Sequence, residues 1–173
     1  RLIVANHPTL LDVVLLVSRL PQADCIVKRA LFENPFLRHV VRGAGYLPND
    51  TGPELIAGMS ERLRQGRTLL LFPEGTRSPM RSLGSFQRGA AHAALETGCE
   101  VVPVTVRCEP PSLMRGQPWW DVPPRRMHFE IEVCEPWSEV PATDPELGRG
   151  LVARALTDRL RDFFVERVIQ ARA

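Results

Sequence analysis

The sequence has little cysteine, and its cysteines are scattered. Among 173 residues there are four, Cys25, Cys99, Cys108 and Cys134, and no two form a C-x-x-C pair. Neither a zinc site nor a disulfide framework is therefore expected. The pattern predicts reduced thiols, a cytosolic setting and no metal site.

Strong net charge and long apolar runs are also missing. The 22 basic and 20 acidic residues leave a net charge of +2, which argues against nucleic acid as a partner. No apolar run approaches the ~20 residues of a membrane span, and no secretory signal pattern opens the chain. Because the chain begins directly in the strand-like run 2–5, we expect a fragment that lacks an N-terminal membrane-anchoring region.

What the sequence does contain is an alternation of two kinds of apolar segment. Runs rich in β-branched residues predict strands at 2–5, 25–27, 45–47, 68–72, 101–106 and 127–133. Segments with helical period predict helices at 10–20, 36–41, 54–64, 86–96 and 147–171. This alternation, with 44% hydrophobic residues, predicts an α/β fold in a single domain over 1–173, with a mixed, mostly parallel sheet flanked by helices.

Two local features add to this organisation. Pro103 removes a hydrogen-bond donor from its strand, which predicts an edge strand or a bulge at that point. The segment from Glu109 to Arg126 is rich in proline and has no period, so it is predicted to be a long loop.

His7 and Asp12 stand five positions apart in the stretch NHPTLLDVV. An imidazole titrates near neutral pH, and a carboxylate that fixes its ring lets it take a proton from an alcohol or thiol. The two side chains meet only if a turn or helix start lies between them, and Thr9 is a candidate cap for a helix from Leu10. His7 would then lie in a strand-to-helix loop, where α/β folds gather ligands. By itself, this spacing arises often by chance.

The second candidate site is the stretch LLLFPEGTRS, Leu69 to Ser78. Its loop contains an acid, a glycine, a guanidinium and two hydroxyls. Such a loop suits an anion such as phosphate, because backbone N–H groups and a forked cation can converge on it. It is equally compatible with a structural turn in which Glu74 and Arg77 pair with each other and Gly75 makes the bend.

Together the two stretches resemble the glycerolipid acyltransferase superfamily, which includes the lysophospholipid and 1-acylglycerol-3-phosphate acyltransferases. One family motif matches Asn6, His7 and Asp12, and a second matches Phe72 to Ser78. The run VVPV at 101–104 matches a later family strand, so the resemblance covers about Leu2 to Val106. It implies a glycerol-3-phosphate acyltransferase-like fold.

The resemblance also implies a reaction and a set of residues. An acyl group would move from an acyl-CoA or acyl carrier protein (acyl-ACP) thioester to the hydroxyl of a membrane lipid acceptor such as a lysophospholipid. His7 would be the general base, and Asp12 would orient its ring. No metal and no cofactor besides the acyl co-substrate is implied. The implied substrate-binding residues are Asn6, Lys28, Glu74, Gly75, Thr76, Arg77 and Ser78.

One block departs from the family pattern. The stretch GAGYLPND has Asn49 and Asp50 where the family carries an arginine associated with the acceptor phosphate. An acid repels a phosphate. Either another arginine substitutes, or the acceptor is not a phosphomonoester. Another alternative is an acyl thioester or ester hydrolase that uses the same His-Asp pair with water.

A membrane acceptor implies work at the cytoplasmic face of the inner membrane, with the protein either peripheral or anchored by the missing segment. Two segments are candidates for touching that surface, and each can instead pack on the protein itself. One is a helical face with Phe32, Phe36, Leu37, Val40 and Val41; the other is the long loop, with Trp119 and Trp120 near Arg115, Arg125 and Arg126.

Overall fold

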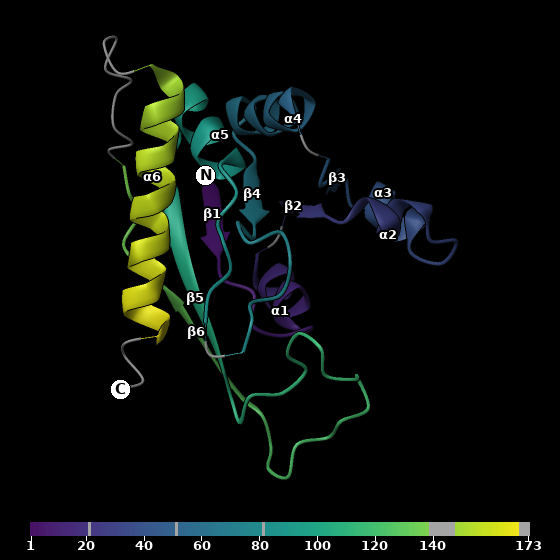
Figure 1. Cartoon of the computed structure of the whole chain (residues 1–173). Helices are drawn as coiled ribbons and strands as arrows, with labels where there is room; N and C mark the ends of the chain where they lie inside the picture. Colours follow the sequence, from purple (N-terminus) through teal and green to yellow (C-terminus); the bar gives the residue numbers. More distant parts are fainter. Residues whose placement is uncertain (21, 51, 81, 139–147, 170–173) are drawn as a thin grey trace.

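A six-stranded sheet forms the centre of the fold (Figure 1). The computed structural model describes residues 1–20, 22–50, 52–80, 82–138 and 148–169. Its strand order is β3-β2-β4-β1-β5-β6; the first five strands are parallel, and β6 is antiparallel to β5. The strands are β1 (Leu2–Ala5), β2 (Ala23–Val27), β3 (Leu47–Pro48), β4 (Thr68–Leu71), β5 (Val101–Glu109) and β6 (His128–Val133). The predicted mixed, mostly parallel sheet is confirmed.

Helices cover both faces of the sheet. Those that connect the parallel strands are α1 (Asp12–Arg19), α2 (Arg29–Glu33), α3 (Arg38–Gly43), α4 (Pro53–Arg64) and α5 (Gly89–Thr97). α6 (Arg149–Phe164) follows β6 and continues into the π-helix η1 (Val165–Ile169). Within the part of the chain that the structure describes, every helix falls short of the length and apolar character needed to cross a membrane.

The core has two layers because side chains alternate across a strand. From β1, Leu2 and Val4 pack with buried residues of α4, α5 and α6. Ile3 and Ala5 point to the other face, where α1 contributes the buried Leu16. The small residues of α5 allow that helix to pack closely, since its four buried side chains are all alanines.

The parallel arrangement gathers several loops at one edge of the sheet. Parallel strands end at the same edge, and the register pairs Val4 of β1 with Leu71 of β4. His7 therefore follows β1 at the edge where the Glu74 loop follows β4. Lys28 follows β2 at this edge, and Asn49 follows β3. Ligands of α/β folds bind at such carboxyl ends.

Several predicted boundaries differ from the structure. The first helix begins at Asp12 rather than Leu10, and the helix predicted at 86–96 is α5, at 89–97. The short helix α2 was not predicted. The helix predicted at 147–171 is α6 followed by η1, while positions 147 and 170–171 lie outside the described residues.

The prediction that Pro103 lies in an edge strand is wrong. β5 is an interior strand between β1 and β6. The irregularity lies in the partner segment instead: Val104 pairs with Val133 but Val101 with Trp137, so the partner has one extra residue between these pairs. Proline has no N–H to donate, and a bulge interrupts the ladder of hydrogen bonds, so a proline is tolerated beside it.

Candidate active site

His7 and Asp12 meet as the sequence predicted. His7 Nδ1 lies 3.0 Å from Asp12 Oδ2, and the Asp12 side chain is fully buried while that of His7 is 16% exposed. The His7 ring also contacts the ring of Phe72, with centroids 4.5 Å apart. The ring is therefore held from two sides, by a carboxylate from α1 and by an aromatic residue that follows β4.

Asp12 is itself fixed by Thr9. Its Oδ2 accepts the Thr9 backbone N–H at 2.6 Å, and its Oδ1 accepts the Thr9 hydroxyl at 2.6 Å. The Thr9 oxygen in turn accepts the N–H of Leu11 at 3.1 Å. The expectation that Thr9 caps a helix starting at Leu10 is wrong, because α1 starts at Asp12. The hydroxyl instead orients the carboxylate.

These contacts determine which ring nitrogen of His7 is free. A carboxylate with two other donors accepts hydrogen bonds, so the short contact assigns the ring proton to Nδ1. In the neutral ring Nε2 is then the acceptor nitrogen, and no residue in the described ranges hydrogen bonds to it. An imidazole in this tautomer can accept a proton at Nε2 while the carboxylate stabilises the resulting charge.

The second motif is attached to the backbone of His7. The N–H of His7 donates to Glu74 Oε1 at 3.3 Å, and the carbonyl of His7 accepts the N–H of Ser78 at 2.7 Å. Glu74 is only 6% exposed and also accepts the Ser78 hydroxyl at 2.5 Å and the Gly84 N–H at 2.7 Å. Two stretches that are far apart in sequence thus form one hydrogen-bonded unit.

The alternative in which Glu74 pairs with Arg77 is wrong. Arg77 Nη1 donates instead to the carbonyls of Leu113 and Met114, at 3.0 Å each. Gly75 does make the bend, with φ of 65° and its N–H bonded to the carbonyl of Phe72 at 3.0 Å. Gly75 is exposed and Thr76 half-buried, so these two residues are more open to solvent than Glu74 is.

Asn6 is fully buried and joins two strands. Its Nδ2 donates to the carbonyl of Val106 at 2.9 Å, and its Oδ1 accepts the N–H of Val106 at 2.8 Å. The amide thus satisfies both backbone groups of a residue in β5. This pair of bonds fixes the backbone immediately before His7.

Lys28 and a neighbouring ion pair lie where β2 and β3 end. Lys28 is exposed. The next residue, Arg29, forms an ion pair with Asp50, and its backbone N–H donates to Asn49 Oδ1 at 3.1 Å. The hydrogen bond from Arg29 holds the pKa of the Asp50 carboxyl below its ordinary value. An arginine is thus present beside the position where the family pattern has one, but an acid neutralises it.

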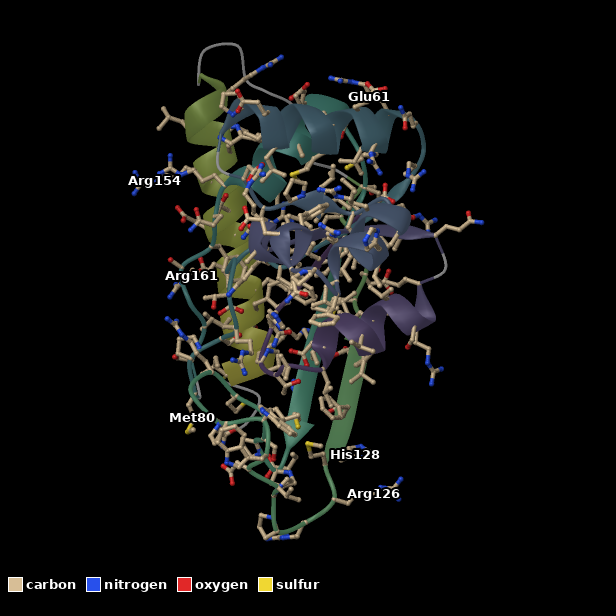
Figure 2. All side chains as sticks on the ribbon, turned by 90° about the vertical axis from the view of Figure 1, so that its right-hand side faces the viewer. Glu61, Met80, Arg126, His128, Arg154 and Arg161 are labelled. Carbon is tan, nitrogen blue, oxygen red and sulfur yellow. The ribbon has the colours of Figure 1, made fainter. Side chains whose placement is uncertain are left out.

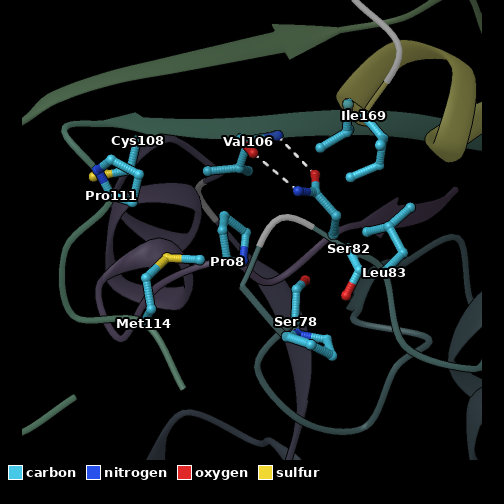
Figure 3. Close-up of a pocket in the computed structure, with 12 residues that line it drawn as sticks. Pro8, Ser78, Ser82, Leu83, Val106, Cys108, Pro111, Met114 and Ile169 are labelled. Atoms are coloured by element: carbon cyan, nitrogen blue, oxygen red, sulfur yellow. Dashed lines mark hydrogen bonds between the residues drawn. The ribbon is translucent and has the colours of Figure 1, made fainter. Parts of the chain in front are cut away.

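A small cavity adjoins this site (Figure 3). Asn6, Pro8 and Ser78 line it, together with Met114 from the long loop and Ile169 from η1. His7 and Asp12 are not among its lining residues. The cavity therefore lies next to the His7–Asp12 pair and does not contain it.

Comparison with known proteins shows the family of the chain. The family model described as Acyltransferase matches residues 1–107. The chain belongs to the acyltransferase family. The matched region contains both motifs and ends just after Val106, the partner of Asn6.

The relatives of this acyltransferase include 1-acyl-sn-glycerol-3-phosphate acyltransferases. It is 33% identical to the chloroplastic protein LPAT1 of Arabidopsis thaliana over 108 residues, which is 60% of this chain and 30% of that protein. It is 39% identical over 83 residues to the protein of Helicobacter pylori strain J99, covering 44% of this chain and 35% of the relative. The chain thus spans about a third of these relatives.

A solved structure shows the same fold. The 1-acyl-sn-glycerophosphate acyltransferase PlsC of Thermotoga maritima matches with a TM-score of 0.65 at 24% identity, over 94% of this chain and 65% of that one. The predicted glycerol-3-phosphate acyltransferase-like α/β fold is confirmed.

The sequence did not identify some residues that shape the site. Gly84 is one, because its N–H binds Glu74 and an added Cβ would crowd Glu74 Oε2 at 3.1 Å. The carbonyls of Leu113 and Met114, which bind Arg77, are backbone groups, so no side-chain pattern marks them. The sequence marked their loop through its length and its tryptophans, and it did not mark these two carbonyls.

Proposed function

We propose that this acyltransferase moves a fatty acyl group from an acyl thioester, acyl-CoA or acyl-ACP, to the hydroxyl of a lysophospholipid, with His7 as general base. The observation that carries this proposal is the contact of 3.0 Å between His7 Nδ1 and the buried Asp12. That contact leaves Nε2 for the hydroxyl. The family relationship supplies the class of reaction.

In this mechanism His7 Nε2 takes the proton of the acceptor hydroxyl as its oxygen attacks the thioester carbonyl carbon. An oxygen–carbon bond forms, and the carbonyl oxygen becomes negative. When the carbon–sulfur bond breaks, the thiolate leaves and takes the proton from Nε2. Asp12 stabilises the imidazolium between these two steps. No acyl-enzyme is needed, because both substrates can bind together.

The remaining predicted residues fall into two groups. Asn6, Glu74 and Ser78 are buried and hydrogen bonded, which supports a role in positioning the catalytic loops rather than in contacting substrate. Gly75, Thr76 and Lys28 are more open and are proposed to contact the acceptor or the developing charge. Arg77 is proposed to support the site by binding a carbonyl of the long loop, and its guanidinium can also bind an anion.

The substrates also suggest where the protein works. A lysophospholipid lies in a bilayer, so we propose action at the cytoplasmic face of the inner membrane, by a single acyltransferase domain over residues 1–173. The relatives support this only through their class, since they are 1-acyl-sn-glycerol-3-phosphate acyltransferases.

The test is an assay of thiol release from acyl-CoA and acyl-ACP, with and without lysophosphatidate or other lysophospholipids, together with detection of the acylated product. We expect release to depend on the acceptor. His7→Ala should lower kcat by about a hundredfold or more without loss of fold. His128→Ala, at an exposed histidine of β6, is the matched control and should retain activity.

Two outcomes would contradict the proposal. Thiol release that is indifferent to every acceptor would indicate a thioester hydrolase that uses water. Activity of His7→Ala near that of the unmodified protein would show that His7 is not the base.

A further inference from the structure

The loop between β5 and β6 presents large apolar side chains to solvent. Trp119 is 74% exposed, Trp120 66% and Val122 82%. The two indole rings contact each other edge to face, with centroids 5.6 Å apart. Isolated exposed apolar residues are ordinary, but several large ones gathered in one loop indicate a contact surface. We call residues 115–126 the tryptophan loop.

The base of this loop is fixed to the active site. Arg77 holds the carbonyls of Leu113 and Met114, and the N–H of Leu10 donates to the same Leu113 carbonyl at 3.1 Å. Met114 is only 6% exposed. Figure 1 shows the loop extending beyond the end of the sheet, past α1, and Figure 2 shows Arg126 at the same end of the molecule as Met80. The base of the tryptophan loop therefore lies beside the loops that carry His7 and Arg77.

The charges of the tryptophan loop favour an anionic surface. Arg115, Arg125 and Arg126 are exposed and flank the two tryptophans in sequence, and Asp121 is the one acid in this loop. Indole rings favour the headgroup level of a bilayer because they combine an apolar body with a polar N–H. Arginines near such a surface are attracted by anionic lipids.

We propose that the tryptophan loop docks the protein onto an anionic lipid bilayer, with Trp119, Trp120 and Val122 entering the headgroup level. This inference rests on the proposed function, since a lipid acceptor is what brings the active site to a bilayer. A bilayer fits the position of the loop, because docking there would bring the edge of the sheet that carries His7 to the surface from which the acceptor comes.

A second exposed apolar group provides the comparison. Phe36 is 86% exposed and Val40 62%, near the start of α3, whereas Val41 is buried at 5%. The predicted apolar face of this segment is therefore divided between solvent and core. No hydrogen bond among the described residues joins Phe36 or Val40 to the catalytic loops. This group serves as the matched control.

The first experiment is co-sedimentation with vesicles of phosphatidylethanolamine containing phosphatidylglycerol. Trp119→Ser with Trp120→Ser should weaken binding by roughly tenfold or more, while Phe36→Ser with Val40→Ser should change it little. Thermal unfolding of each variant confirms that it is folded. Binding that depends on Phe36 and Val40 but not on the tryptophans would overturn the proposal.

The second experiment reads the position of the indole rings directly. Vesicles with brominated acyl chains should quench tryptophan fluorescence in the unmodified protein. Trp119→Phe with Trp120→Phe leaves Trp137, which packs against Phe163 at 5.5 Å and lies under Arg159 at 4.5 Å. Quenching should then be lost while sedimentation with vesicles persists. Undiminished quenching in this variant would overturn the proposal.

A third measurement separates this inference from the proposed function. The double serine variant should keep its kcat on short-chain acceptors below their micelle concentration and lose rate on acceptors embedded in vesicles. Vesicle binding is measured without turnover, so a protein that binds through the loop but transfers no acyl group would refute only the proposed function. Normal vesicle binding with loss of acyl-ACP as donor would assign the loop to a carrier protein and overturn the docking proposal.

Discussion

Asp12 is the residue on which the tautomer and orientation of His7 depend. Asp12→Asn keeps the shape of the side chain but replaces one acceptor oxygen with a donor, which cannot serve all three contacts to His7 and Thr9. We expect kcat to fall by about a hundredfold or more. Steady-state kinetics over a range of pH measures this effect.

Thr9→Val is the graded control for that substitution. It removes the hydroxyl bonded to Asp12 Oδ1 and leaves the backbone N–H bonded to Oδ2. The loss in kcat should be intermediate, about tenfold, because one of two anchors remains. An Asp12→Asn variant as active as Thr9→Val would argue that Asp12 has only a structural role.

Asp50 determines whether Arg29 is available to an anion. Asp50→Asn removes the charge that neutralises Arg29, so the free guanidinium can attract a phosphate beside Lys28. We expect the KM for lysophosphatidate to fall relative to that for a neutral acceptor such as a monoacylglycerol. Arg29→Gln in the same background should reverse the shift. An unchanged ratio across both acceptors would remove this pair from acceptor selection.

At the scale of elements, Arg77 connects the β4–α5 loop to the loop between β5 and β6. Arg77→Ala removes both bonds to the carbonyls of Leu113 and Met114. The long loop should open more often and be cut faster by trypsin after Arg115 and Arg125, which are exposed. Limited proteolysis followed by mass spectrometry locates the cuts. Arg154, exposed on α6, provides an internal reference site whose cleavage should not change.

The sequence predicted these elements unevenly. The run at residues 2–5 was predicted correctly because a buried parallel strand is continuously apolar. The helix α2 was missed because its five residues, Arg29–Glu33, are too few to show a period. The strand order could not be predicted, because the pairing of β1 with both β4 and β5 joins segments far apart in the chain.

The same limit applies to the site. The approach of His7 and Asp12 was predictable because one turn separates them, and a turn is a local structure. The bonds of Glu74 to the backbone of His7 and to Gly84 were not predictable, since they depend on how the β4–α5 loop folds and meets the β1–α1 loop at one edge of the sheet. Residue types therefore indicated the chemistry, and the tertiary structure assigned the supporting roles.

At the scale of the whole molecule, a charge cluster around the buried Asp24 lies near the start of β2, at the end of the strand away from Lys28. Asp24 is 1% exposed and accepts hydrogen bonds from Arg62 at 2.7 Å and from Arg67 Nε at 2.6 Å. Burial alone would raise the pKa of Asp24, but the hydrogen bonds and charges of Arg67 and Arg62 outweigh it and hold the pKa below its ordinary value. The cluster joins β2, the loop before β4 and α4.

This cluster predicts how stability depends on pH. A lowered pKa in the folded state contributes stability that is complete above the unfolded value of about 3.9 and is lost as the pH falls through the folded value. Asp24→Asn should therefore lower the free energy of unfolding by about 2 kcal/mol at neutral pH. It should also make the free energy of unfolding fall less steeply as the pH is lowered into the acid range. Urea unfolding at several pH values tests both, and an unchanged acid slope would contradict the assignment.

The two hydrogen bonds between the Asn6 side chain and the backbone of Val106 have a consequence for motion. Backbone hydrogen bonds at strand ends open often, and a side chain just after a strand would ordinarily move when they do. Here a side chain takes the place of a neighbouring strand and closes the ladder one residue before His7. The backbone that carries His7 can then open only when β1 and β5 separate. The geometry of the His7–Asp12 pair should therefore last as long as the core stays folded, and the Val106 amide should exchange with solvent as slowly as amides at the centre of the sheet.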